Sequence, residues 1–506
     1  MYSLSRTKLI LFAFVFSVFL AGCANINSAY YSDKDNTPAH KIFVMSDLHV
    51  MSSELIHEGA ENSEVFKNYL QGDLKMLLQS EEVLDYLIQQ AISQQVNLVL
   101  IPGDLTKDGE YVCHQLVSQK LEQLREQGIK VLVVPGNHDI NNPRGVVYTA
   151  NQTTPAQKTS VEQFAQLYKN FGYDSESKEY SFYARDPNSL SYCCEPINGL
   201  YMFCLDSCAY DESTETKNMT KGKLRQSTLN WMFPIVDKAK KKGKQVVVMM
   251  HHNLVEHFDD EYRWLNDYMV KDQPSVLNDF LEHDIELVLT GHVHAQDIAQ
   301  TYDRAKKHSI TEVVTSSAVS YPCSYNLITV NKNLTLFTVN NQTINSIPSD
   351  SNYRENAKKF LAISRGTIKS KLNANWSKVL SASSFAKSLG VDITYDFEAQ
   401  GVDNTATMLA DLTRDTLTKF IRIFFAGGED KYDENELQEE FDGTIRKVVY
   451  ELAEEEKSRK SLERLVKLYF GSSFRSIITD TTNIDDANLS NHTDDHNVVI
   501  HLKRHK

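Results

Sequence analysis

The chain has 506 residues, and its hydrophobic fraction of 41% is enough to bury a substantial core, which excludes general disorder. Its 20 glycines and 11 prolines are few for this length and exclude collagen-like and linker-dominated proteins. The 53 Lys and Arg against 67 Asp and Glu leave a formal net charge of −14, which repels a polyanion at long range. We therefore expect no nucleic-acid polymer as a partner, although a metal ion in one cleft can still attract a compact anionic substrate.

The N-terminus has the pattern of a targeting signal. Arg6 and Lys8 precede an uncharged apolar run over residues 9–22, which is too short to span a bilayer and typical of a signal peptide. The run ends in Leu20-Ala21-Gly22-Cys23, which resembles the lipobox of bacterial lipoproteins. This resemblance implies cleavage after residue 22, acylation of Cys23 and lipid anchoring to a bacterial membrane outside the cytoplasm, with residues 23–40 as a polar tether. An ordinary secretion signal with a chance cysteine is the alternative.

Six further cysteines remain in the mature chain, and none has the CxxC spacing of a zinc site. Buried free thiols and one or two disulfides are both compatible with their positions, because spacing alone does not select a pairing. They are Cys113, Cys193, Cys194, Cys204, Cys208 and Cys323.

Between residues 41 and 347, short β-branched runs alternate with amphipathic stretches, which predicts an α/β layered domain. The expected strands are Ile42–Ser46, Val96–Ile101, Lys130–Val134, Tyr201–Leu205, Gln245–Met250 and Ile285–Thr290. The expected helices between them include Glu82–Gln94 and Tyr111–Gln127. We expect antiparallel strands to end this domain, at Glu312–Thr315, Tyr325–Val330 and Leu334–Val339.

A polar break over residues 346–351 separates this domain from residues 352–506, for which the spacing predicts a mostly helical C-terminal domain. The expected helices are Asn352–Trp376, Thr405–Ala426, Glu434–Lys457 and Lys460–Phe470. The closing segment contains His492, His496, His501 and His505. We expect it to be a solvated polar tail rather than a metal site.

Five of the apolar runs end in polar clusters rich in metal-ligand side chains. The clusters are Asp47-Leu48-His49, Gly103-Asp104, Gly136-Asn137-His138-Asp139, His251-His252 and Gly291-His292-Val293-His294. Each cluster alone is a weak signal, because short Asp and His patterns occur by chance. Ligands bind at the carboxyl ends of strands in an open α/β sheet, so clusters that are far apart in the sequence can converge there. Because all five clusters follow the carboxyl ends of predicted strands, we expect them to form a single site.

The chemistry of these donors is coherent. Carboxylates, imidazoles and one amide oxygen suit Mn, Fe or Zn, whereas the absence of thiolates argues against a structural zinc site. Seven donors are too many for one ion, so we expect two divalent or mixed-valence transition-metal ions with a shared carboxylate. Such a centre attracts phosphate and lowers the pKa of a bridging water to supply a nucleophile.

The five blocks, in this order, resemble the signature of the calcineurin-like metallophosphoesterase superfamily over residues 41 to about 345. Within it the chain is most similar to bacterial class III cyclic-nucleotide phosphodiesterases, including lipoprotein members with a helical C-terminal extension. The resemblance implies a four-layer sandwich of two mixed β-sheets flanked by helices. It also implies that Asp47, His49 and His294 bind the first metal, Asp104 bridges, Asn137, His251 and His292 bind the second, and His138 protonates the leaving oxygen.

Two departures from the family pattern stand out. Many relatives have a proline after the fourth-block histidine pair, where this chain has Asn253, so preferring His251 to His252 rests on block alignment. In the protein-phosphatase branch an Asp three positions after the bridging Asp orients the catalytic His, but here that position is Lys107 and Asp108 comes next. We therefore assign no dyad partner to His138 from the sequence.

An insert over residues 255–278 separates two of the blocks and contains Phe258, Tyr262, Trp264 and Tyr268. We expect these aromatics to pack in a core, with a lid that stacks on a base as the alternative. The predicted function is hydrolysis of cyclic nucleotides or similar small phosphodiesters by a metal-bridging hydroxide. The alternatives are a phosphomonoesterase or nucleotidase with the same metals, and a surface lipoprotein whose C-terminal domain binds a partner.

Overall fold

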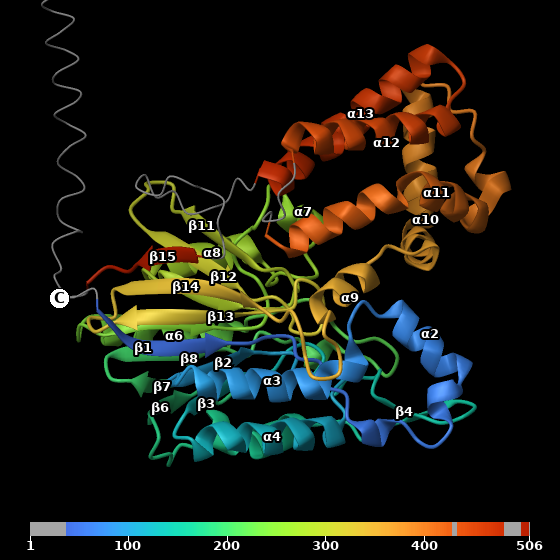
Figure 1. Ribbon diagram of the computed structural model, residues 1–506. Helices are drawn as coiled ribbons and strands as arrows, with labels where there is room; N and C mark the ends of the chain where they lie inside the picture. The colour runs from blue at the N-terminus through green and yellow to red at the C-terminus, as the bar shows by residue number, and fades with distance from the viewer. Residues whose placement is uncertain (1–36, 428–432, 480–496, 505–506) are drawn as a thin grey trace, which may run out of the picture.

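The computed structural model describes residues 37–427, 433–479 and 497–504. The predicted signal peptide and Cys23 lie outside these residues. Two mixed β-sheets pack on each other, with helices on their outer faces (Figure 1). The layer order of helices, sheet, sheet and helices confirms the predicted α/β sandwich.

The first sheet has the strand order β15-β14-β13-β1-β2-β3. Its strands are β1 (Pro38–Val44), β2 (Leu98–Pro102), β3 (Lys130–Val134), β13 (Ser324–Asn331), β14 (Leu336–Thr343) and β15 (Asn497–His501). Strands β1, β2 and β3 are parallel, and the pairs from β1 through β13 and β14 to β15 are antiparallel.

The second sheet has the strand order β11-β12-β10-β9-β8-β7-β6. Its strands are β6 (Ser181–Arg185), β7 (Tyr192–Ile197), β8 (Leu200–Cys204), β9 (Gln245–Met249), β10 (Leu287–Thr290), β11 (Asp297–Tyr302) and β12 (Ser309–Val314). Strands β8, β9, β10 and β12 are parallel. Strands β6 and β7 at one end of the sheet and β11 at the other pair antiparallel with their neighbours, which makes this sheet mixed as well.

The central strands are covered on both faces. Every residue of β2 and β9 is buried, as their largely apolar sequences predict. Helices α3 (Ser80–Ser93) and α4 (Tyr111–Glu126) pack on the first sheet, and α6 (Gln226–Lys240) and α8 (Gln273–Glu282) pack on the second. The smaller elements are α2 (Glu64–Gly72), β4 (Val146–Tyr148), β5 (Thr153–Pro155), α5 (Val161–Leu167) and α7 (Glu261–Trp264).

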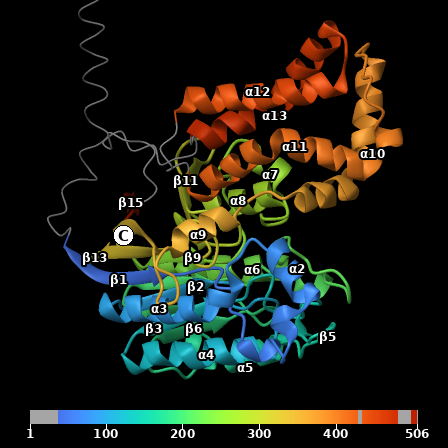
Figure 2. The same cartoon turned by 45° about the vertical axis from the view of Figure 1, so that its right-hand side comes forward.

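The helical prediction for the C-terminal region is confirmed, with shifted boundaries. The helices are α9 (Tyr353–Phe360), α10 (Arg365–Ser388), α11 (Phe397–Phe425), α12 (Glu434–Leu452) and α13 (Glu456–Thr479) (Figure 2). The single helix expected over Asn352–Trp376 is divided, because residues 361–364 are not helical. Buried side chains from α10, α12 and α13 form a small core of their own.

Two predictions for the ends of the sheets hold only in part, although β13 and β14 form the antiparallel pair expected there. The run at Glu312–Thr315 lies in β12, which is parallel to β10 and antiparallel only to β11. The closing segment is not a solvated tail throughout, because β15 pairs with β14 and buries Val498 and Ile500. His501 ends this strand, whereas His492, His496 and His505 lie outside the described residues.

The prediction for the cysteines has a plain outcome among the described residues. The six cysteines that the structure describes are all free and buried, so the disulfide alternative is not observed. Across residues 37–427, 433–479 and 497–504, none of the helices combines the length and apolar character that crossing a bilayer requires.

Candidate metal centre

The polar clusters predicted from the sequence come together at the carboxyl ends of five strands, three from the first sheet and two from the second. They place Asp47 and His49 after β1, Asp104 after β2, Asn137 and His138 after β3, His251 after β9, and His292 and His294 after β10. The site therefore lies where parallel strands of both sheets end, as expected for an α/β fold.

Asp47, His49, Asp104 and His294 form the first cluster, in which one ligand atom from each lies within 4.8 Å of the others. The two imidazole Nε2 atoms of His49 and His294 are 3.1 Å apart. Oδ1 of Asp47 lies 3.3 Å from Nε2 of His294, and Oδ2 of Asp104 lies 3.7 Å from Nε2 of His49. These four atoms converge on one point.

Asp104, His251 and His292 form the second cluster, also within 4.8 Å. Nε2 of His251 lies 3.4 Å from Oδ2 of Asp104 and 3.1 Å from Oδ1 of Asn137. His292 has its Nε2 3.4 Å from the carbonyl oxygen of Asp267, which leaves Nδ1 for the cluster. Asp104 belongs to both clusters, in agreement with the bridging position predicted for it.

The ligand atoms of the first cluster suit a metal cation. Oδ1 of Asp47 is buried without a hydrogen-bond partner, whereas Oδ2 accepts from Ser46 Oγ at 2.6 Å and from the main-chain N of His292 at 2.9 Å. A buried carboxylate oxygen without a partner is costly, and a metal ion among it and the imidazoles of His49 and His294 would satisfy it. Imidazole and carboxylate donors suit a divalent transition metal.

The backbone at the site is held in an unusual conformation. Five of the predicted ligands have positive φ angles, a region that residues other than glycine seldom occupy. The angles are 50° at Asp47, 43° at His49, 49° at Asp104, 71° at His292 and 63° at His294. Such strain is typical of functional sites, where the surrounding structure fixes the geometry.

Two glycines of the motifs allow the loops to approach each other closely. A Cβ atom at Gly136 would overlap the main chain and carboxylate of Asp104. A Cβ atom at Gly291 would overlap the side chains of Ser46 and Asp47. The glycine in each block is therefore required by the close packing of the ligand loops.

The paired histidines after β9 have different environments. Nδ1–H of His251 donates to the carbonyl oxygen of Pro102 at 2.8 Å, so its Nε2 faces Asp104. Nδ1 of His252 lies 2.8 Å from Ser207 Oγ, and its Nε2 lies 2.9 Å from the carbonyl oxygen of Thr220. His251, and not His252, is therefore the histidine in the cluster.

His138 has the carboxylate partner that the sequence did not predict. Its Nδ1 lies 2.7 Å from the carbonyl oxygen of Lys107 and 3.0 Å from Oδ1 of Asp108, while its Nε2 lies 4.0 Å from Oδ2 of Asp104. Burial alone lowers the pKa of His138, but the carboxylates of Asp104 and Asp108 outweigh it and raise that pKa above its usual value. Asp108, one position beyond the one expected, thus orients His138.

Asp108 is itself fixed by a buried cation. The Nζ of Lys107 donates to Oδ2 of Asp108 at 2.7 Å and to Oε1 of Glu110 at 2.9 Å, and it lies 4.8 Å from the ring centre of Tyr69. Burial opposes the charge of Lys107, but the two carboxylates outweigh it and hold its pKa well above its ordinary value. A chain of charges therefore runs from Lys107 through Asp108 to His138.

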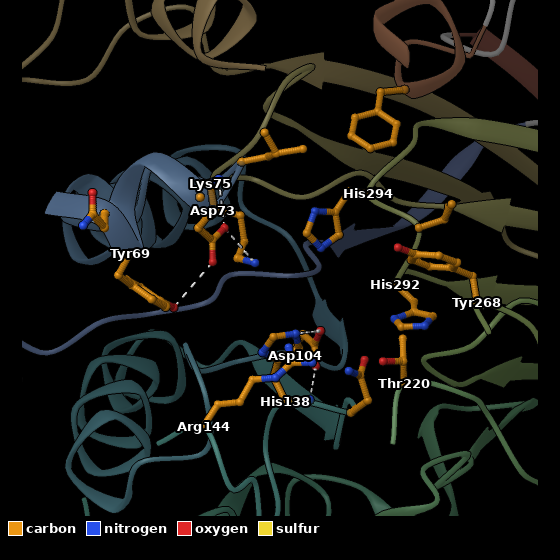
Figure 3. A pocket seen from close by; sticks show the side chains of 16 residues that line it. Tyr69, Asp73, Lys75, Asp104, His138, Arg144, Thr220, Tyr268, His292 and His294 are labelled. Carbon is orange, nitrogen blue, oxygen red and sulfur yellow. Dashed lines mark hydrogen bonds and ion pairs between the residues drawn. The ribbon is translucent and has the colours of Figure 1, made fainter. Parts of the chain in front are cut away.

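The two clusters border a cavity of about 610 Å³. Figure 3 shows Lys75 and Tyr69 on one side of it, Tyr268 and His292 on the other, and Arg144 beside His138. The lining comprises Asn68, Tyr69, Gly72, Asp73, Leu74, Lys75, Asp104, Asn137, His138, Arg144, Thr220, Tyr268, His292, Val293, His294 and Phe425.

The aromatic insert has two roles in this arrangement. Phe258 is buried and contacts Phe424 of α11 at 5.5 Å between ring centres, which agrees with the predicted core packing. Tyr268 instead lines the cavity, with its ring centre 5.0 Å from that of His292. The expectation that all these aromatics pack in a core was wrong for Tyr268. Main-chain hydrogen bonds join Asn253 to Tyr268 and to Val270, and they direct the end of the insert back to the site.

Comparison with known protein families identifies the family of the chain. Residues 40–296 match the sequence profile of the family described as calcineurin-like phosphoesterase. The chain belongs to this family. Solved structures similar to this calcineurin-like phosphoesterase include a dimetal phosphatase from Danio rerio, with 13% identity and a TM-score of 0.41 over 61% of this chain and 97% of that one. Another is the purple acid phosphatase PPD1 from yellow lupin, with 11% identity and a TM-score of 0.35 over 62% of this chain and 53% of that one. No curated protein matches the sequence.

Family membership makes this calcineurin-like phosphoesterase a phosphoester hydrolase with a predicted two-metal site. The sequence does not predict a role for four residues near that site. Asp108 is one position out of the expected register, and Lys75, Arg144 and Phe425 come from segments outside every motif. Only the tertiary fold brings these three to the cavity.

Proposed function

We propose that this calcineurin-like phosphoesterase is a two-metal phosphodiesterase that hydrolyses small phosphodiesters, with cyclic nucleotides among them. The observation that carries the proposal is the position of two ligand clusters, joined by Asp104, beside a cavity of about 610 Å³. A cavity of this size accommodates a phosphate together with substituents on two of its oxygens.

The proposed ligands of the first ion are Asp47, His49 and His294. The proposed ligands of the second are Asn137, His251 and His292, and the carboxylate of Asp104 is shared between the two ions. When bound, two such ions polarise the phosphoryl oxygens and supply the activated water that attacks phosphorus.

The role proposed for His138 is to protonate the leaving oxygen. Its Nδ1–H is held by the carbonyl of Lys107 and the carboxylate of Asp108, so Nε2 is the atom left to carry a proton toward the substrate. The carboxylate of Asp108, 3.0 Å from Nδ1, stabilises the protonated ring that an acid requires.

Two cationic side chains border the cavity. Lys75 lies 3.0 Å from the carboxylate of Asp73, which offsets its charge, whereas no carboxylate pairs with Arg144 among the residues that the structure describes. Arg144 can therefore pair with a phosphoryl oxygen of the substrate. This pairing serves a diester and a monoester alike, so the substrate assay below distinguishes the two.

We also propose that the protein is lipid-anchored outside the cytoplasm through Cys23. The support is the Leu20-Ala21-Gly22-Cys23 sequence after an apolar run of signal-peptide type. A diesterase in that location would act on small phosphodiesters outside the cytoplasm.

The substrate proposal is tested with the metal-loaded mature protein and a panel of cyclic nucleotides, bis(p-nitrophenyl) phosphate, p-nitrophenyl phosphate and nucleoside monophosphates. We expect kcat/KM for the diesters to exceed that for the monoesters by at least tenfold. A preference for monoesters would instead establish a phosphomonoesterase or nucleotidase. Hydrolysis of none of them would favour the partner-binding alternative.

A further inference from the structure

The C-terminal helical region contributes a side chain to the cavity. Phe425, the last residue of α11, lines the cavity together with Tyr268 of the insert. Both rings pack against one apolar patch formed by Val293, Ala295 and Val314. Because Val293 lies between two predicted metal ligands, this patch fixes both rings next to the metal centre.

Several contacts hold Phe425 in place. The main-chain N of Gln296 donates to the carbonyl oxygen of Phe425 at 2.9 Å, and the neighbouring Phe424 packs against Phe258. Phe425 also contacts the main hydrophobic core but stays only half-buried. The C-terminal end of α11 lies beside α7 in both views of the fold (Figures 1 and 2). The ring is therefore positioned by the fold while one part of it remains open to the cavity.

The cavity has a different character on each side. Figure 3 shows Lys75 and Tyr69 opposite Tyr268, and Arg144 beside His138. With His138 as the proposed acid, the leaving oxygen of a bound ester would lie next to His138, on the Arg144 side. The substituent that stays on phosphorus would then point toward the aromatic side.

We propose that Tyr268 and Phe425 form a subsite for the substituent retained on phosphorus, and that this subsite takes a flat aromatic group such as a nucleobase or an aryl ring. The inference rests on the proposed phosphodiesterase function and narrows its substrate class. Aromatic side chains bind flat rings by offset or edge contacts, with little selectivity among the rings. The C-terminal helical region is thus a specificity element of the active site.

The test compares two diesters with the same leaving group, bis(p-nitrophenyl) phosphate and methyl p-nitrophenyl phosphate, on the full-length metal-loaded protein. Removing one ring contact should raise KM about tenfold. We expect Phe425→Ala to raise KM for the bis-aryl ester by that factor, to leave its kcat within twofold, and to leave both constants for the methyl ester unchanged. Leu417→Ala is the matched control, since Leu417 lies on the same helix and is exposed. Equal changes for both esters, or no change for either, would overturn the proposal.

A binding measurement separates this inference from the proposed function. Calorimetry with phenylphosphonate and methylphosphonate needs no turnover, and we expect the metal-loaded protein to bind the phenyl compound about tenfold more tightly. Phe425→Ala should abolish that preference, and Phe425→Leu replaces it in the test if the alanine variant does not fold. Equal affinity of the unmodified protein for both compounds would refute the subsite. Failure to hydrolyse any diester, with the phenyl preference intact, would refute only the diesterase proposal.

Discussion

Replacing His138 tests the proposed acid in the most detail. The imidazole is 15% exposed toward the cavity, and its Nδ1 is held at 2.7 Å from the Lys107 carbonyl and 3.0 Å from Asp108. His138→Ala leaves every predicted metal ligand in place, so the metal content should not change. A positioned acid supplies roughly a hundredfold or more in rate when the leaving group is an alkoxide. Hydrolysis of a cyclic nucleotide should slow by at least that factor.

The control is a substrate whose leaving group does not need a proton. A p-nitrophenolate leaving group is stable as an anion and needs no proton, so bis(p-nitrophenyl) phosphate should lose much less rate in the same variant. The assay is kcat for both substrates, together with elemental analysis of the variant. Asp108→Asn should show the same pattern with a smaller loss, because it weakens the orientation of His138 without removing the ring. Equal losses on the two substrates would refute the acid role and assign His138 to stabilising charge on the phosphoryl oxygens.

Three further predictions concern the metals, acid stability and the anchor. Asp104→Ala should lower the occupancy of both metal sites in elemental analysis, whereas His49→Ala should chiefly empty the first; selective loss of one ion in both variants would remove Asp104 from the bridging role. Burial lowers the pKa of His114 to about 4, below the unfolded value of about 6.5, so its neutral ring stabilises the fold above pH 6.5 and this stability is lost as the pH falls toward 4. Between about pH 7.5 and pH 5 the metal-free protein should lose roughly 2 kcal/mol more than His114→Asn in urea unfolding, and equal losses would contradict the assignment. Cys23→Ser should move the protein from the membrane fraction to the soluble fraction; a variant that still sediments with membranes would contradict the anchor.

The sequence was sufficient to predict the architecture and the convergence of the ligand loops for a simple reason. Buried parallel strands are short apolar runs, and each functional block directly follows one of them, so the fold class and the edge of the sheet were readable together. Asp104 illustrates this, because its place after β2 puts it between the ends of β1 and β3.

The remaining features depend on contacts between distant segments. The pairing of β15 with β14 joins Val498 to Val339 across the whole helical region, and a short alternating run gives no sign of its partner. Phe425 has the same helical spacing as its neighbours in α11, so periodicity predicts burial and not a place in the cavity. Asp108 reaches His138 because the loop after β2 folds back on the loop after β3, which residue counting does not reveal.

A metal titration of the metal-free mature protein tests the proposed two-metal centre and its action on phosphodiesters. Bound metal per chain and the rate of bis(p-nitrophenyl) phosphate hydrolysis are measured on the same samples. We expect two transition-metal ions to bind per chain and hydrolysis to follow occupancy of the second. Saturation at one ion, or full occupancy of two ions without diester hydrolysis, would contradict it.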